Sequence, residues 1–228
     1  MKIGVILPTF RDGAHDALAA GAACEAAGLD GVFAYDHLWP MGRPDRPSLA
    51  PFPLLAAIAA STSSIAVAPL VARVGVVSTA ALVQQFATLA LIAPGRVLAP
   101  LGTGDSLSRE ENIAYGLGFA SARVRRELLA EAAAAIAPVA PVWIGAGAPE
   151  TNELARAGNY ELTVWNASPH DVAAFALDGP VNWAGDPASD LDAHLKELEV
   201  AGATWAVFSP RVDLGALALW REAHRGPK

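Results

Sequence analysis

The sequence has one cysteine, Cys24, in 228 residues. An intrachain disulfide and a cysteine-based zinc cluster are therefore excluded. Basic residues are also few: 16 Lys and Arg stand against 23 Asp and Glu, which gives a formal net charge of −7. Because nucleic acids and anionic membranes attract clustered Lys and Arg, this balance argues against both as partners.

Long hydrophobic runs are missing as well. A bilayer-spanning helix needs about 20 consecutive apolar residues, and Gln84 and Gln85 interrupt the best candidate. The first ten residues, MKIGVILPTF, have neither a basic leading segment nor a small-residue cleavage site, so they predict a strand and not a secretion signal. The 53% hydrophobic and 17% charged residues are unlike those of a disordered chain. We therefore expect a globular cytoplasmic protein with no membrane segment.

What the sequence does contain is alternation. Short apolar runs that end in Gly, Pro, Asp or Ser are each followed by a longer Ala- and Leu-rich segment with helical spacing. The predicted strands are residues 2–9, 31–37, 65–74, 96–102, 141–145, 162–166, 179–183 and 204–209. The predicted helices are residues 14–27, 52–60, 79–92, 122–136, 150–157, 170–176, 189–201 and 214–223.

Eight strand–helix units can close as a (β/α)₈ TIM barrel or lie open as a doubly wound sheet. The unbroken count of eight favours the barrel, as a single α/β domain over residues 1–228. In a barrel of this kind the active site lies at the carboxyl ends of the strands. The loops that follow each strand are therefore the places to look for chemistry.

Two of these strand ends are rich in glycine. Gly102-Thr103-Gly104-Asp105 follows the fourth predicted strand, and the run Gly145 to Pro149 (GAGAP) follows the fifth. Neither spacing is a Rossmann fingerprint. Both can present backbone N–H groups to a phosphate, or they can simply be tight turns. The letters GDSL at 104–107 resemble a hydrolase motif, but no Asp-x-x-His partner follows, so we treat that match as a coincidence.

Asp36 and His37 end the second predicted strand. A carboxylate beside an imidazole can transfer protons at neutral pH. The plain alternative is an Asp that caps a loop next to a His that packs. The five His residues are scattered and show no metal-ligand spacing, so we expect no metal site.

Four stretches taken in order resemble the bacterial-luciferase-like oxidoreductase superfamily, and within it the branch that uses the deazaflavin coenzyme F420. They are GVFAYDH at 31–37, QFATL at 85–89, APGRV at 93–97 leading into LGTGD at 101–105, and PVWIGAGAP at 141–149 followed by LAR at 154–156. The resemblance implies a (β/α)₈ barrel and hydride transfer between F420 and a small organic substrate.

The resemblance also implies roles for individual residues. His37 matches the histidine beside the reactive face of the cofactor ring, and Asp105 matches a position that donates a proton in some relatives. The matching stretches place the cofactor-binding residues at Asp36, Leu70, Val71, Ala72, Gly102, Thr103, Gly104, Gly145, Gly147 and Ala148. Of these, Leu70 to Ala72 belong to the stretch PLVAR at 69–73, which matches a bulge under the middle of the ring. Gly147 and Ala148 match the backbone that holds the cofactor phosphate.

Three other hypotheses follow from the same pattern. The barrel can bind FMN and act as a monooxygenase, or carry a flavin or F420 without catalysis, or bind no ligand at all. The short segments 137–140 and 184–187 stand where relatives carry long insertions over the substrate, so the chain is a shortened member with an open site. Members of this superfamily often dimerise through early helices, and residues 79–92 are apolar nearly all round, so we expect a homodimer.

Overall fold

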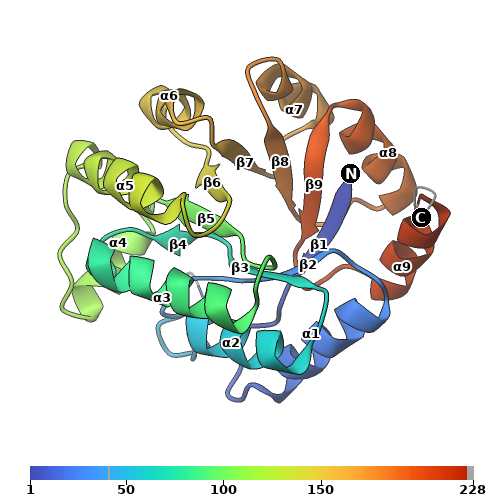
Figure 1. Ribbon diagram of the computed structural model, residues 1–228, viewed down its shortest axis with the longest axis horizontal. Helices are drawn as coiled ribbons and strands as arrows, with labels where there is room; N and C mark the ends of the chain where they lie inside the picture. The colour runs from blue at the N-terminus through green and yellow to red at the C-terminus, as the bar shows by residue number, and fades with distance from the viewer. Residues whose placement is uncertain (41, 225–228) are drawn as a thin grey trace.

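The computed structural model describes residues 1–40 and 42–224, and it forms a nearly closed parallel barrel with helices around it (Figure 1). The strands of the described part are β1 (Lys2–Ile6), β2 (Gly31–Ala34), β3 (Ala66–Pro69), β4 (Ala72–Arg73), β5 (Ala99–Gly102), β6 (Val142–Gly145), β7 (Glu161–Trp165), β8 (Val181–Gly185) and β9 (Ala203–Phe208). They form one sheet in the order β3-β2-β1-β9-β8-β7-β6-β5-β4, with every pairing parallel.

Val67 in β3 closes the barrel by pairing with the segment just before β5. Its N–H donates to the carbonyl of Arg96 at 2.8 Å, and its own carbonyl accepts from the N–H of Leu98 at 3.3 Å. A parallel bridge joins Val67 to Val97 at the same place. Because every pairing is parallel, the carboxyl ends of β2 and β5 lie at the same rim of the barrel, although the two strands are far apart in sequence.

The helices of the described part surround the strands in Figure 1. They are α1 (His15–Ala26), α2 (Pro51–Ser61), α3 (Thr79–Ile92), α4 (Ser108–Ala114), α5 (Ala122–Ile136), α6 (Pro149–Ala157), α7 (Pro169–Ala176), α8 (Leu191–Val200) and α9 (Leu214–Ala223). Ser78, Ser121 and Ser168 each accept a backbone N–H at the start of a helix, and so do Asp190 and Asp213. Such caps satisfy N–H groups that the first helical turn leaves unpaired.

The core has two layers. Between the sheet and the helices lies a large apolar cluster that includes Ile3, Leu55, Phe86 and Trp220. Inside the barrel lies a second cluster, made up of Ile6, Phe33, Ala68, Leu70, Trp143, Ala184, Trp205 and Val207. The interior is thus packed with side chains, as in other barrels of this type, which leaves the carboxyl rim for a site.

The barrel predicted from the sequence is confirmed, with three differences of detail. The predicted strand at 65–74 is divided into β3 and β4 around Leu70 and Val71, whose connecting peptide bond is cis. The sequence interpretation missed α4 entirely. Helix α3 buries one face through Leu82, Phe86 and Leu89 but leaves Leu91 83% exposed.

Among the helices of the described residues, none combines the length and hydropathy that crossing a bilayer requires.

Candidate active site

The imidazole of His37 lies at the carboxyl rim, three residues beyond β2. Its Nδ1 lies 2.8 Å from Oε1 of Glu111, which comes from α4. The Glu111 side chain is only 1% exposed, whereas that of His37 is 21% exposed. The backbone N–H of Leu38 also donates to Oε2 of Glu111, at 3.3 Å. The buried carboxylate therefore holds both the ring and the backbone that carries it.

Arg73 balances the charge of this buried carboxylate. Its Nη2 lies 3.0 Å from Oε2 of Glu111, and its side chain is 5% exposed. Its Nη1 donates to Oδ1 of Asn112 at 3.4 Å, and its backbone N–H donates to Oδ2 of Asp36 at 2.8 Å. Burial raises the pKa of Asp36, while the N–H and guanidinium of Arg73 oppose that rise. The end of β2, the end of β4 and α4 are thus tied into one polar network.

Aromatic side chains flank this network. The rings of Phe10 and Tyr35 are stacked, with centroids 5.3 Å apart and planes 8° apart, and both lie within 6.4 Å of the His37 ring. The Tyr35 ring also lies 6.2 Å from that of Trp165, which is 50% exposed. Burial and the nearby carboxylate of Asp186 raise the pKa of Tyr35 to about 12, so this phenol stays neutral at physiological pH. The rim is therefore a partly open aromatic surface beside His37.

Val71 brings together three of the predicted cofactor-binding positions. A Cβ added at Gly102 would lie 2.5 Å from Cγ2 of Val71, and one added at Gly145 would lie 3.7 Å from Cγ1 of Val71. The absence of a side chain at Gly102 is what lets Val71 cover the ends of β5 and β6. Leu70 and Ala72 are buried on either side of it. A flat ring placed over the barrel mouth would meet this floor of small side chains.

Asp105 lies at the start of α4. One carboxylate oxygen accepts the N–H of Leu107 at 2.9 Å, the N–H of Ser108 at 3.0 Å and the hydroxyl of Ser108 at 3.2 Å. Gly104 precedes it with φ +68°, a left-handed conformation that glycine adopts without strain. Thr103 donates its hydroxyl to the carbonyl of Gly104 at 3.2 Å. The Gly-Thr-Gly-Asp segment thus shapes the turn that begins the helix carrying Glu111.

Gly147 and Ala148 lie at the N-terminal end of α6, where both are exposed. Nothing lies within 4 Å of a Cβ added at Gly147, so its backbone faces open space. Its N–H, however, donates to Oδ1 of Asn152 at 3.1 Å. A phosphate at this position would have to share or replace that contact, and the acidic Glu150 in the first helical turn would oppose it.

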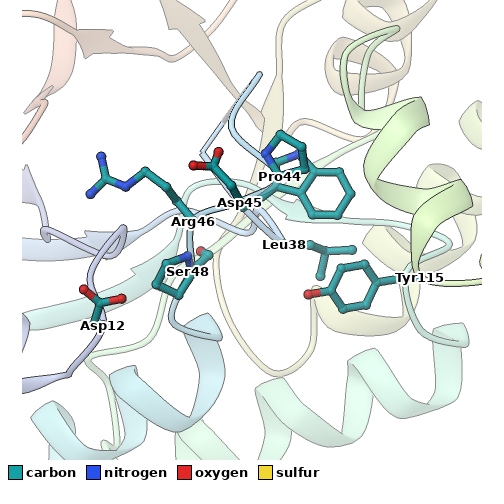
Figure 2. Close-up of a pocket in the computed structure, with 9 residues that line it drawn as sticks. Asp12, Leu38, Pro44, Asp45, Arg46, Ser48 and Tyr115 are labelled. Atoms are coloured by element: carbon teal, nitrogen blue, oxygen red, sulfur yellow. The ribbon is translucent and has the colours of Figure 1, made fainter.

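A pocket of about 440 Å³ lies beside the loop that follows His37 (Figure 2). It is lined by Asp12, Leu38, Trp39, Pro44, Asp45, Arg46, Pro47, Ser48 and Tyr115. Figure 2 shows charged side chains on one side and the ring of Tyr115 on the other. The Trp39 and Tyr115 rings lie 5.7 Å apart. The pocket therefore combines apolar and polar walls within two residues of the histidine.

The structure places the predicted residues in four groups. Asp36 and His37 join one network, Val71 joins Gly102 and Gly145, and Asp105 is engaged at the start of α4. Gly147 and Ala148 lie apart from these, at the exposed start of α6. The sequence interpretation missed Glu111 and Asn112, and it marked Arg73 only as part of the stretch 69–73. One signal was available for Glu111: Ser108 and Glu111 have the Ser-x-x-Glu spacing that often begins a helix.

A (β/α)₈ barrel with a histidine held at its carboxyl rim defines an enzyme-like scaffold, and comparison with known proteins gives the family. The family model for luciferase-like monooxygenases matches residues 1–139, and the chain belongs to this family. The resemblance drawn from the sequence is confirmed at that level.

Two curated relatives carry more specific names. The F420-dependent hydroxymycolic acid dehydrogenase of Mycobacterium tuberculosis is 30% identical over 219 residues, which cover 91% of this chain and 59% of that protein. The F420-dependent glucose-6-phosphate dehydrogenase of Beutenbergia cavernae is 35% identical over 137 residues, covering 58% of this chain and 38% of that protein. The chain thus spans less than two thirds of the length of either relative.

Solved structures of similar shape extend over the whole chain. An F420-dependent secondary alcohol dehydrogenase in complex with an F420-acetone adduct matches with a TM-score of 0.81 and 15% identity, covering 99% of both chains. The monooxygenase RslO1 from Streptomyces bottropensis matches with a TM-score of 0.76 and 12% identity, covering 97% of both chains. At these identities the matches establish the fold.

Proposed function

We propose that the protein is an oxidoreductase that binds coenzyme F420 at the carboxyl rim of the barrel and transfers a hydride between it and a small organic substrate. The observation that carries this proposal is the His37 imidazole, held at 2.8 Å by buried Glu111 and partly open on the aromatic rim. The F420-dependent names of the two curated relatives support the choice of cofactor.

The residues present fit such a cofactor. Val71, Gly102 and Gly145 form a floor of small side chains, and the half-exposed Trp165 stands at the rim beside Tyr35. Gly147 at the start of α6 has open space around its backbone, so a phosphate can reach its N–H by displacing Oδ1 of Asn152, against the opposing charge of Glu150. These residues would hold the ring and the phosphate, respectively.

In the proposed reaction, the side chains of this protein transfer the proton. Coenzyme F420, when bound, supplies the hydride chemistry. His37 accepts the proton that a substrate hydroxyl loses as the hydride leaves the adjacent carbon, and returns it in the reverse direction. The pocket lined by Trp39, Arg46 and Tyr115 includes the residues that directly follow His37. It offers both apolar and polar contacts to a substrate.

A turnover assay with a matched variant tests this function. Purified protein is mixed with oxidised F420 and a panel of small alcohols and hydroxylated sugars, and the loss of oxidised F420 is followed by absorbance. We expect substrate-dependent reduction, and a loss of about 10²-fold or more in His37→Asn with F420 binding retained. Exchange of F420 without substrate-dependent reduction would instead identify a non-catalytic carrier. Oxygen-dependent turnover with reduced FMN would identify the flavin branch.

The assembly belongs to the same proposal. The chain acts as one barrel domain over residues 1–228, in the cytoplasm, as a homodimer that packs through α3. The 83% exposure of Leu91 and the 41% exposure of Ile92 at the end of α3 support this contact. Sedimentation at micromolar concentration tests it: a dimer that Leu91→Glu converts to a monomer is expected, and a monomeric wild-type protein overturns it.

A further inference from the structure

The contacts of Glu111 restrict where the proton of His37 can lie. An ionised carboxylate only accepts hydrogen bonds, so the hydrogen shared with His37 at 2.8 Å belongs to Nδ1. Arg73 provides the countercharge at 3.0 Å, and the N–H of Leu38 occupies the same carboxylate oxygen as Arg73. Within residues 1–40 and 42–224, the protein gives His37 a hydrogen-bond partner at Nδ1 alone.

From this geometry we propose that Glu111 is a positioning residue that holds His37 in its Nδ1-protonated tautomer. The lone pair then lies on Nε2, on the side of the ring away from Glu111, where it can receive a substrate proton. The neutral histidine side chain has two tautomers, and the hydrogen bond of one nitrogen decides the state of the other. The assignment of the tautomer is independent of the proposed function. Only the statement that Nε2 receives a proton from a substrate rests on that function.

The neighbours of the ring support the assignment. Phe10 and Tyr35 lie with ring centroids 6.4 Å and 6.3 Å from that of His37, and both are apolar at their faces. In the described part of the chain, neither ring forms a hydrogen bond with a nitrogen of His37. Glu111 is held in turn from the other side by Arg73, which is 5% exposed. The carboxylate that holds the His37 ring is therefore itself held by Arg73.

The tautomer can be read directly in the unmodified protein. Nitrogen-15 correlation spectra of the side chains distinguish protonated from unprotonated ring nitrogens, and the spectrum of His37→Asn identifies the His37 signals among the five histidines. At a pH where the imidazole is neutral and no cofactor is present, we expect a protonated Nδ1 and an unprotonated Nε2. A protonated Nε2 in the wild-type protein would overturn the proposal.

Two variants on the same helix separate positioning from general support. In Glu111→Gln, which keeps the shape but can donate as well as accept, we expect a mixture of tautomers and a kcat at least tenfold lower, with KM changed less than threefold. Glu110 is one residue earlier and exposed, so the tautomer and the kcat of Glu110→Gln should match those of the wild type. An unchanged tautomer in a folded Glu111→Gln protein would refute the role of Glu111. Because the spectra need no F420, failure to bind F420 would overturn the proposed function and leave this result intact.

Discussion

His37 and Glu111 are separated by 74 residues in the chain, and their side chains meet at 2.8 Å. The contact joins the end of β2 to α4, which follows β5. The buried carboxylate of Glu111 therefore contacts both the His37 side chain and, through Arg73, the end of β4.

Removing that carboxylate should destabilise the fold. In Glu111→Ala the guanidinium of Arg73 keeps its burial and loses its countercharge, and breaking a buried pair from one side costs about 3–5 kcal/mol. We expect a free energy of unfolding lower by this amount in urea denaturation. The matched variant Glu110→Ala, at an exposed position of α4, should stay within about 0.5 kcal/mol of wild type. A Glu111→Ala protein as stable as that control would mean that Arg73 finds another partner.

Asp105 can cap α4 or transfer a proton to the substrate, and two substitutions at this position distinguish these roles. Its carboxylate accepts N–H groups of Leu107 and Ser108, as an N-terminal cap does. We expect Asp105→Ala to cost about 1 kcal/mol in urea denaturation, and Asp105→Asn to cost little, since Asn also caps helices well. If Asp105 instead transfers a proton to substrate, Asp105→Asn will keep its stability and lose turnover.

A third prediction concerns the opposite end of the barrel, where Glu161 begins β7. Burial raises the pKa of Glu161 to about 7, while the charge of Lys2 opposes the rise. The folded protein thus binds this proton more tightly than the unfolded chain does. The contribution of Glu161 to stability should therefore be highest below its unfolded pKa of about 4.5 and be lost as pH rises through about 7.

The size of this fall follows from the shift, at about 1.4 kcal/mol per pKa unit and less for a side chain that is partly exposed. We expect Glu161→Gln to remove about 1–3 kcal/mol of pH dependence between pH 5 and pH 8, measured as urea midpoints at each pH. Glu153→Gln, at an exposed position of α6, should leave the wild-type profile unchanged. Equal slopes in wild type and Glu161→Gln would show that Glu161 titrates normally.

The fold was predictable because its repeating strand–helix unit produces a repeating pattern of apolar residues in the sequence. Each buried strand is a short apolar run, and each covering helix has a spaced apolar face, so the eight units could be counted. Helix α4 has no such face: the sequence SREENIA is polar and covers one rim of the barrel. Apart from the Ser-x-x-Glu spacing of Ser108 and Glu111, nothing in its local pattern separates it from a loop.

The site was predictable only in part, for a related reason. His37 and Gly102 stand at strand ends, where barrel enzymes place their chemistry, and the family resemblance marked them. Glu111 and Arg73 become partners only when the barrel closes, so no local motif joins them. The one local signal, Ser108-x-x-Glu111, indicates a capping box, but the Glu111 carboxylate contacts His37.

Direct binding of the cofactor tests the central claim. Wild-type protein is titrated with F420 and, separately, with FMN, and the quenching of ligand fluorescence gives a Kd for each. We expect micromolar binding of F420, weaker binding of FMN, and a His37→Asn variant that still binds F420. Tighter binding of FMN than of F420 would contradict the choice of cofactor, and binding of neither ligand would contradict the proposed function altogether.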